Sequence, residues 1–267
     1  MKVDTIPHLN FSGKTVLVTG SSRNLGKTIA AAFIETGGRV ILHGSEENLR
    51  STKSEMESDY PKAELYSISF DLGQPEAIEK AFDQLKSEGW MPDVLINNAA
   101  HLGLGESGFL EQSPEFFREV IEVNLFGAFL CSQIAAQYLK DTGKKGSIVN
   151  ISSLAGRRGI HGRSGYNVSK AALDSMTRSM AQELSGDGIR VNSLVLGYVW
   201  TERWNHLDEG VADRRKANIP SHAPSSQEEI ARTTVFLASD SAPTLVGSQI
   251  VLDGGMDIQQ LPATVAV

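Results

Sequence analysis

Lys14-Thr15-Val16-Leu17-Val18-Thr19-Gly20-Ser21-Ser22-Arg23-Asn24-Leu25-Gly26 is the stretch that decides the fold. Residues 14–19 form a short run, rich in apolar and β-branched side chains, that ends at a glycine, which is typical of a buried strand. Apolar residues then recur at helical spacing until a pair of glycines ends the helix: Leu25, Ile29, Ala30, Phe33 and Ile34. The sequence therefore predicts a strand, a glycine-containing turn and a helix in succession.

The same alternation of strand and helix continues along the chain. Further strands are predicted over residues 39–43, 63–70, 93–97, 147–152, 189–196 and 248–252, and further helices over 46–58, 75–87, 114–139 and 227–239, with one more around residue 166. Strands that are apolar along their whole length, alternating with helices, indicate a parallel sheet covered on both faces. We therefore expect an α/β fold with one domain over residues 1–267. A long irregular segment, residues 198–226, is predicted to be a lid over a site.

Composition and charge exclude several classes of function. The 267 residues are 40% hydrophobic and 21% charged, which is ordinary for a globular protein with a large core. A net charge of -7 argues against nucleic acid or an anionic membrane as the main partner. The single cysteine, Cys131, cannot form an intrachain disulfide. Residues 1–12 have no apolar core of a signal peptide, and no uninterrupted apolar run approaches the roughly 18 residues of a membrane span, so a cytoplasmic location is expected.

The turn between the first strand and the first helix has the features of a phosphate-binding loop. Gly20 and Gly26 let the backbone approach a pyrophosphate, and the N-terminus of the helix offers free N–H groups and the positive end of a dipole. A glycine-containing turn is also common in ordinary loops. Its position after a strand and before a helix is what favours the phosphate interpretation.

Tyr166 and Lys170 stand four positions apart in a segment with helical spacing. They should therefore share one face of a helix. A cation beside a phenol lowers the pKa of the hydroxyl from about 10, which would make Tyr166 a candidate acid or base near neutral pH. The alternative is a packed ring beside a lysine whose amine reaches the solvent.

Five motifs, in this order, resemble those of the short-chain dehydrogenases/reductases. They are Thr19-Gly20 with Gly26, Asn97-Asn98-Ala99, Asn124, Ser153 before Tyr166 and Lys170, and Asp253-Gly254-Gly255. The spacing from Ser153 to Tyr166 is 166 − 153 = 13 residues, as in the family. The resemblance runs from about Lys14 to Asp257 and implies a Rossmann-type sheet of seven parallel strands.

By this resemblance, Asn124, Ser153, Tyr166 and Lys170 form a catalytic tetrad. Tyr166 would exchange a proton with a carbonyl or alcohol oxygen that Ser153 holds. Lys170 would lower the pKa of Tyr166 and bind the nicotinamide ribose, and Asn124 would hold a water through its backbone. The hydride would pass to or from C4 of a nicotinamide. For Ser153 and Asn124 taken alone, helix capping or a helix kink is the simpler interpretation.

Two departures from the family pattern and one substitution bear on the cofactor. Asn24 replaces the middle glycine of the turn, which Asn suits because it tolerates left-handed backbone conformations. Ala100 replaces a glycine after the fourth strand, and its methyl group would narrow the cofactor cleft on the side of the nicotinamide. Gly44 stands where an NAD enzyme usually has an acid for the ribose diol.

Arg23 and Ser45 resemble the residues with which the family binds NADP, since an arginine side chain suits a phosphate. The negative charges of Glu46 and Glu47 argue against a bound phosphate. Arg23 can also be a solvated loop cation. We therefore expect NADP(H), with NAD(H) left open. The expected cofactor-binding residues are Gly20, Ser22, Arg23, Asn24, Leu25, Gly26, Ser45, Asp71, Leu72, Asn98, Ala99, Ala100, Tyr166, Lys170, Gly197, Val199 and Thr201.

The expected substrate is a small carbonyl or alcohol compound, and no metal site is expected. Its expected contacts are Ser153, His161, Tyr198, Trp200 and Trp204, although the aromatic residues can also simply pack the lid. One alternative is a 3-oxoacyl-thioester reductase, for which Asp187 replaces an expected basic residue and Lys144 partly matches another. A second alternative is a nucleotide-sensing protein without turnover. The family implies a homotetramer or homodimer, to which the tail 261–267 could contribute.

Overall fold

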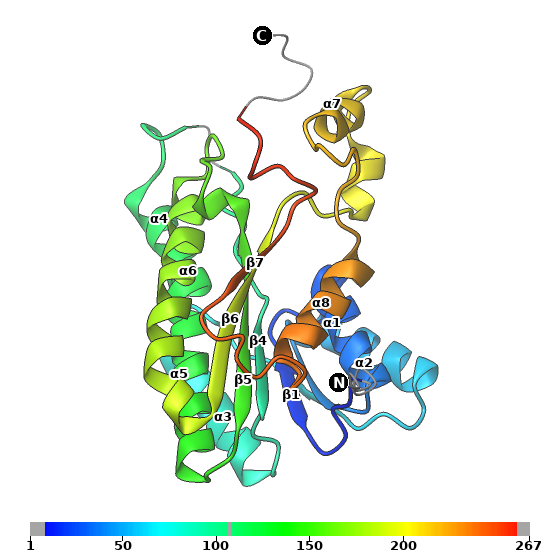
Figure 1. Ribbon diagram of the computed structural model, residues 1–267, viewed down its shortest axis with the longest axis vertical. Helices are drawn as coiled ribbons and strands as arrows, with labels where there is room; N and C mark the ends of the chain where they lie inside the picture. The colour runs from blue at the N-terminus through cyan, green and yellow to red at the C-terminus, as the bar shows by residue number, and fades with distance from the viewer. Residues whose placement is uncertain (1–8, 106–107, 261–267) are drawn as a thin grey trace, which may run out of the picture.

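The computed structural model describes residues 9–105 and 108–260, so the N-terminal residues 1–8 and the tail 261–267, on which two of the expectations fall, lie outside it. One sheet of seven parallel strands runs through the molecule (Figure 1). The strand order is β3-β2-β1-β4-β5-β6-β7. The strands are β1 (Thr15–Val18), β2 (Arg39–His43), β3 (Leu65–Ile68), β4 (Val94–Asn97), β5 (Gly146–Ser153), β6 (Ile189–Leu196) and β7 (Gln249–Leu252). The predicted α/β fold with a seven-stranded parallel sheet is confirmed.

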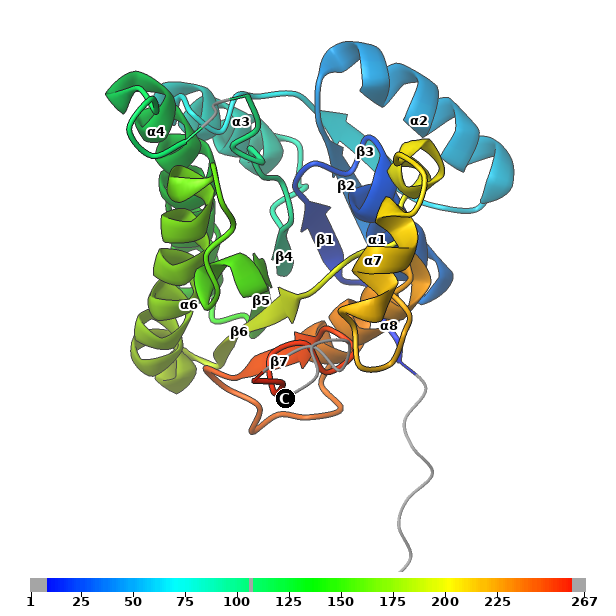
Figure 2. The ribbon, with the colours of Figure 1, turned by 90° about the horizontal axis from the view of Figure 1, so that it is seen from above.

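Helices cover both faces of the sheet (Figures 1 and 2). One face carries α1 (Asn24–Glu35), α2 (Glu46–Asp59) and α8 (Gln227–Ala238), and the other carries α3 (Pro75–Ser87), α4 (Pro114–Ile121), α5 (Gly127–Asp141) and α6 (Ser164–Leu184). Successive strand residues face opposite sides, as the two-residue period of a strand requires. Val16 and Val18 pack in the core beneath α1, whereas Leu17 packs in the core beneath α3 and α5. Burial on both sides explains why the strands are apolar throughout.

The helix predicted over residues 114–139 is not uniform. A π-helical turn, η1 (Glu122–Phe126), separates α4 from α5, and the N–H of Gly127 bonds the carbonyl of Glu122, five residues earlier. Asn124 lies inside this turn. By length and mean hydropathy, the run Pro114–Asp141 would pass as a membrane span, but 44% of the tested window is buried in the protein, and core helices pass the same test. The run packs against α3 and α6 as part of the core.

The segment expected to be irregular, residues 198–226, contains two short helical elements. They are a 3₁₀ helix, η4 (Glu202–His206), and α7 (Val211–Ala217). The two ends of the segment meet, because Trp200 N donates to the carbonyl of Ser225 at 2.9 Å and Ser225 N donates to the carbonyl of Tyr198 at 2.9 Å. The segment is therefore a closed loop with internal helices, which corrects the prediction that it is irregular.

The order of the strands defines a switch point between β1 and β4. From β1 the chain builds β2 and β3 on one side, then crosses to build β4 to β7 on the other. In open parallel sheets, ligands bind at the carboxyl ends of the strands beside such a point. Thr19 directly follows β1, and Asn97 and Ser153 are the last residues of β4 and β5, so the predicted site begins at the carboxyl ends of these strands.

Candidate active site

The turn after β1 brings helix α1 close to the end of β4. A side chain on Gly26 would place its Cβ 2.2 Å from the carbonyl oxygen of Gly20 and 2.6 Å from Nδ2 of Asn98, so only glycine fits. Gly20 has a φ of +66° and Asn24 a φ of +47°, both in the left-handed region. The tolerance of Asn for that region, predicted from the sequence, is what the turn requires at position 24.

The N-terminus of α1 is suited to an anion. No side chain in the part of the chain that the structure describes caps this end of the helix, and its first turn contains no acidic residue. The N–H groups of a first helical turn have no partner within the helix, and they carry a partial positive charge. The turn of Gly20 and Gly26, here called the glycine cradle, and this uncapped helix end fit a dinucleotide pyrophosphate.

Asn98 and Thr19 join the turn to β4. Nδ2 of Asn98 donates to the carbonyl of Thr19 at 2.9 Å, and Oγ1 of Thr19 accepts from the N–H groups of Asn98 and Ala99 at 3.0 Å. These bonds hold the two loops at the switch point in one arrangement. Asn98 and Ala99, predicted to contact the cofactor, thus lie beside the glycine turn.

His43, at the end of β2, connects the segments that follow β1 and β3, a role that was not predicted from the sequence. The N–H of Gly20 donates to Nδ1 of His43 at 3.0 Å, and Nε2 lies 3.0 Å from the carbonyl of Phe70. Because Nδ1 accepts a bond, the proton is on Nε2, which donates to that carbonyl. Burial lowers the pKa of His43 to about 4, against the smaller opposing effects of the Phe70 bond and of Asp71. The imidazole is therefore neutral, and it fixes the shape of the turn.

The position expected to select the cofactor leaves no room for a side chain. A Cβ on Gly44 would lie 2.4 Å from Oγ and 2.7 Å from Cβ of Ser22. Arg23 is exposed, and it forms no ion pair with any residue in the described part of the chain. Ser45 is exposed at the start of α2. The site thus offers an exposed guanidinium and a hydroxyl where an NAD enzyme has a carboxylate, which fits a ribose phosphate.

The remaining predicted cofactor residues follow β3 and β6. Asp71 is exposed and accepts a bond from the N–H of Gly73 at 2.8 Å, so it caps a turn. Leu72 is buried against the π-helical run, since a Cβ on Gly127 would lie 2.6 Å from its carbonyl oxygen. Gly197 passes Asp253 so closely that its Cβ would lie 2.7 Å from the Asp253 Cβ. Val199 pairs with the far end of the lid, at Ser225, and Thr201 begins η4.

Tyr166 and Lys170 lie on one face of α6, as predicted, but their relation differs from the expectation. Nζ of Lys170 donates to the carbonyl of Ile151 in β5 at 2.8 Å and lies 5.7 Å from the centre of the Tyr166 ring. Lys170 is only 3% exposed, and burial lowers its pKa to about 8, partly offset by the charge of Asp174. The amine is held by the sheet rather than reaching the solvent.

Burial raises the pKa of the Tyr166 hydroxyl, whereas a lowered pKa was expected. A hydrogen bond with Ser153 and the charge of Arg163 oppose this shift but do not outweigh it. The charge of Lys170 does not contribute to the pKa of Tyr166, because the amine is directed to the Ile151 carbonyl. The pKa of Tyr166 rises because desolvation disfavours the charged phenolate. The phenol is therefore protonated at neutral pH, with Ser153 near enough to affect its pKa.

Asn124 connects the loop after β4 to the helix that carries Tyr166. Its Oδ1 accepts from His101 N at 2.7 Å, and its Nδ2 donates to the His101 carbonyl at 2.9 Å and to Oγ of Ser169 at 3.0 Å. Oγ of Ser169 in turn donates to the Tyr166 carbonyl at 2.8 Å. The bonds that define Asn124 are thus made by its side chain, and they fix His101 and α6 relative to each other.

The five predicted substrate residues do not all come together. Tyr198 and Trp204 pack edge to face, with ring centres 5.9 Å apart. Trp200 is 43% exposed, and His161 is exposed, with no hydrogen bond or ion pair to another described residue. Ser153 accepts a bond from Ala155 N at 3.2 Å as it caps a short helix, so the capping interpretation applies, and the same side chain is near enough to Tyr166 to affect the pKa of the phenol.

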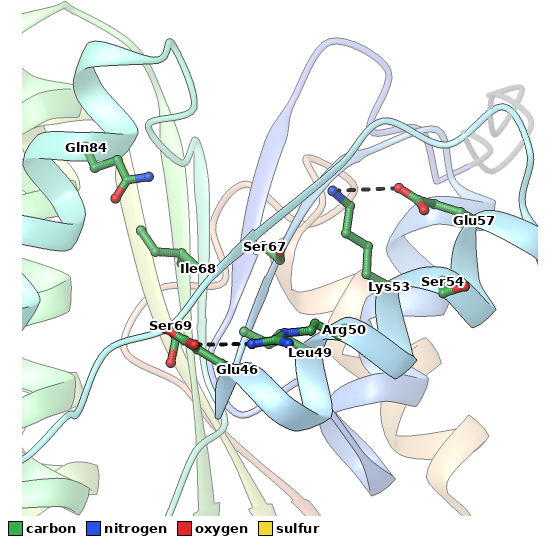
Figure 3. A pocket seen from close by; sticks show the side chains of 10 residues that line it. All are labelled: Glu46, Leu49, Arg50, Lys53, Ser54, Glu57, Ser67, Ile68, Ser69 and Gln84. Atoms are coloured by element: carbon green, nitrogen blue, oxygen red, sulfur yellow. Dashed lines mark ion pairs between the residues drawn. The ribbon is translucent and has the colours of Figure 1, made fainter.

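A separate groove of about 530 Å³ lies at the open edge of the sheet (Figure 3). It is bounded by α2, the outer edge of β3 and Gln84 of α3, and two ion pairs of α2, Glu46 with Arg50 and Lys53 with Glu57, lie at its rim. None of the predicted site residues lines it.

Comparison with known proteins agrees with this geometry. The model of a protein family described as enoyl-(acyl carrier protein) reductase matches residues 20–257. A 3alpha-hydroxysteroid dehydrogenase from Mediterraneibacter gnavus is 34% identical over 243 residues, which cover 90% of this chain and 96% of that protein. A 3-oxoacyl-[acyl-carrier-protein] reductase from Aquifex aeolicus is 33% identical, covering 93% and 99%.

Solved structures show the same fold. A protein from Beutenbergia cavernae, described as an NAD(P)-dependent gluconate 5-dehydrogenase and holding NADP, has a TM-score of 0.87 and 29% identity, covering 94% of this chain and all of that one. A 4-hydroxyisoleucine dehydrogenase with NADH has a TM-score of 0.84 and 31% identity, covering 92% and 100%. The chain belongs to the short-chain dehydrogenase/reductase family of oxidoreductases.

Proposed function

We propose that this protein transfers a hydride between NADP(H) and the carbonyl carbon of a small ketone, or the matching secondary alcohol. The observation that carries the proposal is the closeness of Ser153 to a half-buried, protonated Tyr166 at the carboxyl edge of the sheet, which is near enough for Ser153 to lower the pKa of the phenol. The nicotinamide, when bound, supplies or accepts the hydride. The protein contributes the proton and the alignment.

The proposed proton transfer runs through Tyr166. In reduction, the π bond of the substrate carbonyl breaks as a hydride adds to its carbon, and the oxygen takes the proton of the phenol. Ser153 holds that oxygen by a hydrogen bond. The Lys170 ammonium, held beside the ring by the Ile151 carbonyl, would bind the ribose hydroxyls of the nicotinamide. Asn124 acts as a positioning residue through His101 and Ser169.

Three features support NADP(H) as the cofactor. Gly44 has no room for the carboxylate that would bind a ribose diol, Arg23 has no ion-pair partner among the described residues, and Ser45 is exposed beside them. The seventeen residues proposed to contact it are those named from the sequence, with Gly20, Gly26 and Asn98 forming the pyrophosphate cradle. Residues 198–226 would act as the lid of a one-domain enzyme.

Two further properties are proposed from supporting observations. A groove of about 320 Å³ between α5 and α6, lined in part by Phe129 and Met180, supports pairing with a second copy of the chain, in a homodimer or homotetramer. Light scattering of the purified protein would test this. A cytoplasmic location, supported by the resemblance to bacterial reductases, remains a proposal.

A panel of ketones and alcohols, followed by nicotinamide absorbance with NADP(H) and NAD(H), tests the function. The panel should hold cyclic and aromatic ketones, sugars, oxo acids and acetoacetyl thioesters. We expect turnover with at least one class and a higher kcat/KM with NADP(H). Efficient turnover confined to the thioesters would favour the 3-oxoacyl reductase, an activity of the Aquifex aeolicus relative. Nucleotide binding without turnover of any compound would favour the nucleotide-sensing alternative.

A further inference from the structure

The last turn of α7 carries three basic residues, and one of them differs from the others. Arg214 and Lys216 are exposed, whereas Arg215 is half-buried. The Cζ atom of Arg215 lies 5.8 Å from the centre of the Tyr198 ring and 5.9 Å from the centre of the Trp204 ring. Its guanidinium is therefore turned inward, against the two aromatic residues of the lid.

The Trp204 ring and the backbone of Tyr198 are each fixed by a hydrogen bond. The two rings pack edge to face, with an angle of 86° between their planes. Nε1 of Trp204 donates to the carbonyl of Val199 at 2.9 Å, and the carbonyl of Tyr198 accepts from Ser225 N at 2.9 Å. Arg215 thus rests on a rigid aromatic support, which reduces the conformational entropy that a guanidinium loses when it binds a ligand.

No carboxylate among the described residues neutralises the charge of Arg215. Within residues 9–105 and 108–260, its side chain forms no ion pair and no hydrogen bond, whereas Arg39, which is also half-buried, pairs with Glu64. A cation–π contact uses the charge of the guanidinium, and its N–H donors, which lie in the guanidinium plane, stay available. Such a fork of donors matches the two oxygens of a carboxylate.

Tyr198, which supports Arg215, follows the strand that pairs with the strand of Ser153. Leu196, the last residue of β6, pairs with Ser153 of β5, and Tyr198 follows two residues later at the same edge of the sheet. A molecule whose carbonyl lies against Ser153 would extend beneath the lid toward Tyr198 and Arg215. The chain as a whole carries a net charge of -7, which repels anions, so an anionic substrate needs a dedicated cation.

We propose that Arg215 binds a carboxylate of the substrate, so that the enzyme acts on oxo acids and the matching hydroxy acids in preference to neutral ketones and alcohols. This inference rests on the proposed function and deepens it. Arg215 would determine specificity and would not take part in proton or hydride transfer.

Matched pairs of an acid and its amide test the proposal. Suitable probes are 3-oxobutanoate with 3-oxobutanamide, and 4-oxocyclohexanecarboxylate with its carboxamide, each assayed with NADPH. For the wild type, we expect a higher kcat/KM for the acid of a pair. Arg215→Gln should lower the ratio of acid to amide by about ten-fold or more, mainly through KM, and Arg215→Lys should restore part of it. Arg214→Gln, an exposed neighbour in the same helix, should leave the ratio unchanged.

The outcomes separate this inference from the proposed function. If the Arg215→Gln variant reduces acid and amide more slowly by the same factor, Arg215 only packs the lid. If the wild type reduces neutral ketones but no acid, the inference is wrong. In both cases the reductase function stands. If no probe is reduced, the fluorescence of Trp204 decides, because a carboxylate at Arg215 should change it. Titration with 4-oxocyclohexanecarboxylate should then perturb the emission of the wild type but not of Arg215→Gln, and equal responses would overturn the inference.

Discussion

Asn124 and Ser169 are joined by a hydrogen bond of 3.0 Å between Nδ2 and Oγ, which links the π-helical turn η1 to the helix of Tyr166. The same amide holds both backbone groups of His101. One buried side chain therefore connects the loop after β4, the long helical run and α6. The shape of the site depends on this connection, because each of these elements carries a proposed catalytic or cofactor-binding residue.

Replacing Asn124 by Ala should reduce both stability and activity. The change removes three hydrogen bonds at a position that is 2% exposed and leaves polar groups of His101 without partners. We expect the free energy of unfolding to fall by about 2–4 kcal/mol in urea denaturation. Gln137→Ala, which removes one exposed hydrogen bond with Asp141, is the control and should change it by less than about 0.5 kcal/mol. Equal effects of the two changes would contradict the role given to Asn124.

Introducing an acid at position 44 should shift the cofactor preference. Gly44→Asp needs space, so it should be combined with Ser22→Gly, which removes the atoms that its Cβ would meet. The new carboxylate would repel a ribose phosphate and bind a ribose diol. The ratio of kcat/KM for NADPH to that for NADH should fall by about ten-fold or more. Ser22→Gly alone is the control, and a double variant that keeps the ratio of this control would show that cofactor choice is made elsewhere.

Stability should depend on the titration of His43. Its pKa is about 4 in the folded protein and 6.5 when unperturbed, so the unfolded state binds more protons between these values. The stability contributed by the neutral imidazole is fully present above pH 6.5 and is lost as pH falls toward 4, by roughly 3 kcal/mol in total. His43→Gln keeps a donor and an acceptor but cannot be protonated. Denaturation curves between pH 5 and pH 7 should therefore have a steeper pH dependence in the wild type, and identical slopes would refute this account.

The buried, charged amine of Lys170 should lower the stability of the folded protein. Burial lowers its pKa to about 8, below the usual 10.5, so keeping the amine charged at pH 7 costs free energy in the folded state. The cost is present below pH 8 and disappears as pH rises toward 10.5. Lys170→Met should raise the free energy of unfolding at pH 7 by about 1–3 kcal/mol and abolish turnover. A variant that is both inactive and less stable would mean that the bond to the Ile151 carbonyl outweighs desolvation.

The fold could be predicted from the sequence because its signals are local and repeated. The strands of residues 39–43 and 189–196 and the helix of residues 75–87 have the bounds that their patterns predicted. The position of Asn24 also followed from local chemistry, since its φ of +47° is one that Asn tolerates. Each of these depends on neighbouring residues along the chain.

What could not be predicted depends on contacts between distant segments. Nothing around His43 indicates that its ring would bond Gly20 and Phe70, 23 and 27 residues away. The raised pKa of Tyr166 depends on burial by the folded protein, and spacing from Lys170 carries no information about it. The inward turn of Arg215 requires the lid to close on itself at Ser225. An available signal was that the lid carries both aromatic and basic residues.

The central claim is that Tyr166 is the proton donor, and Tyr166→Phe tests it most directly. The variant keeps the ring in α6 and removes only the hydroxyl beside Ser153. The measurement is kcat with NADPH and the best ketone of the panel, beside NADPH binding followed by fluorescence. Tyr138→Phe, which removes a hydroxyl from α5, is the control. The account predicts that kcat falls by about 10²-fold or more while NADPH still binds; a Tyr166→Phe variant with the turnover of the wild type would contradict it.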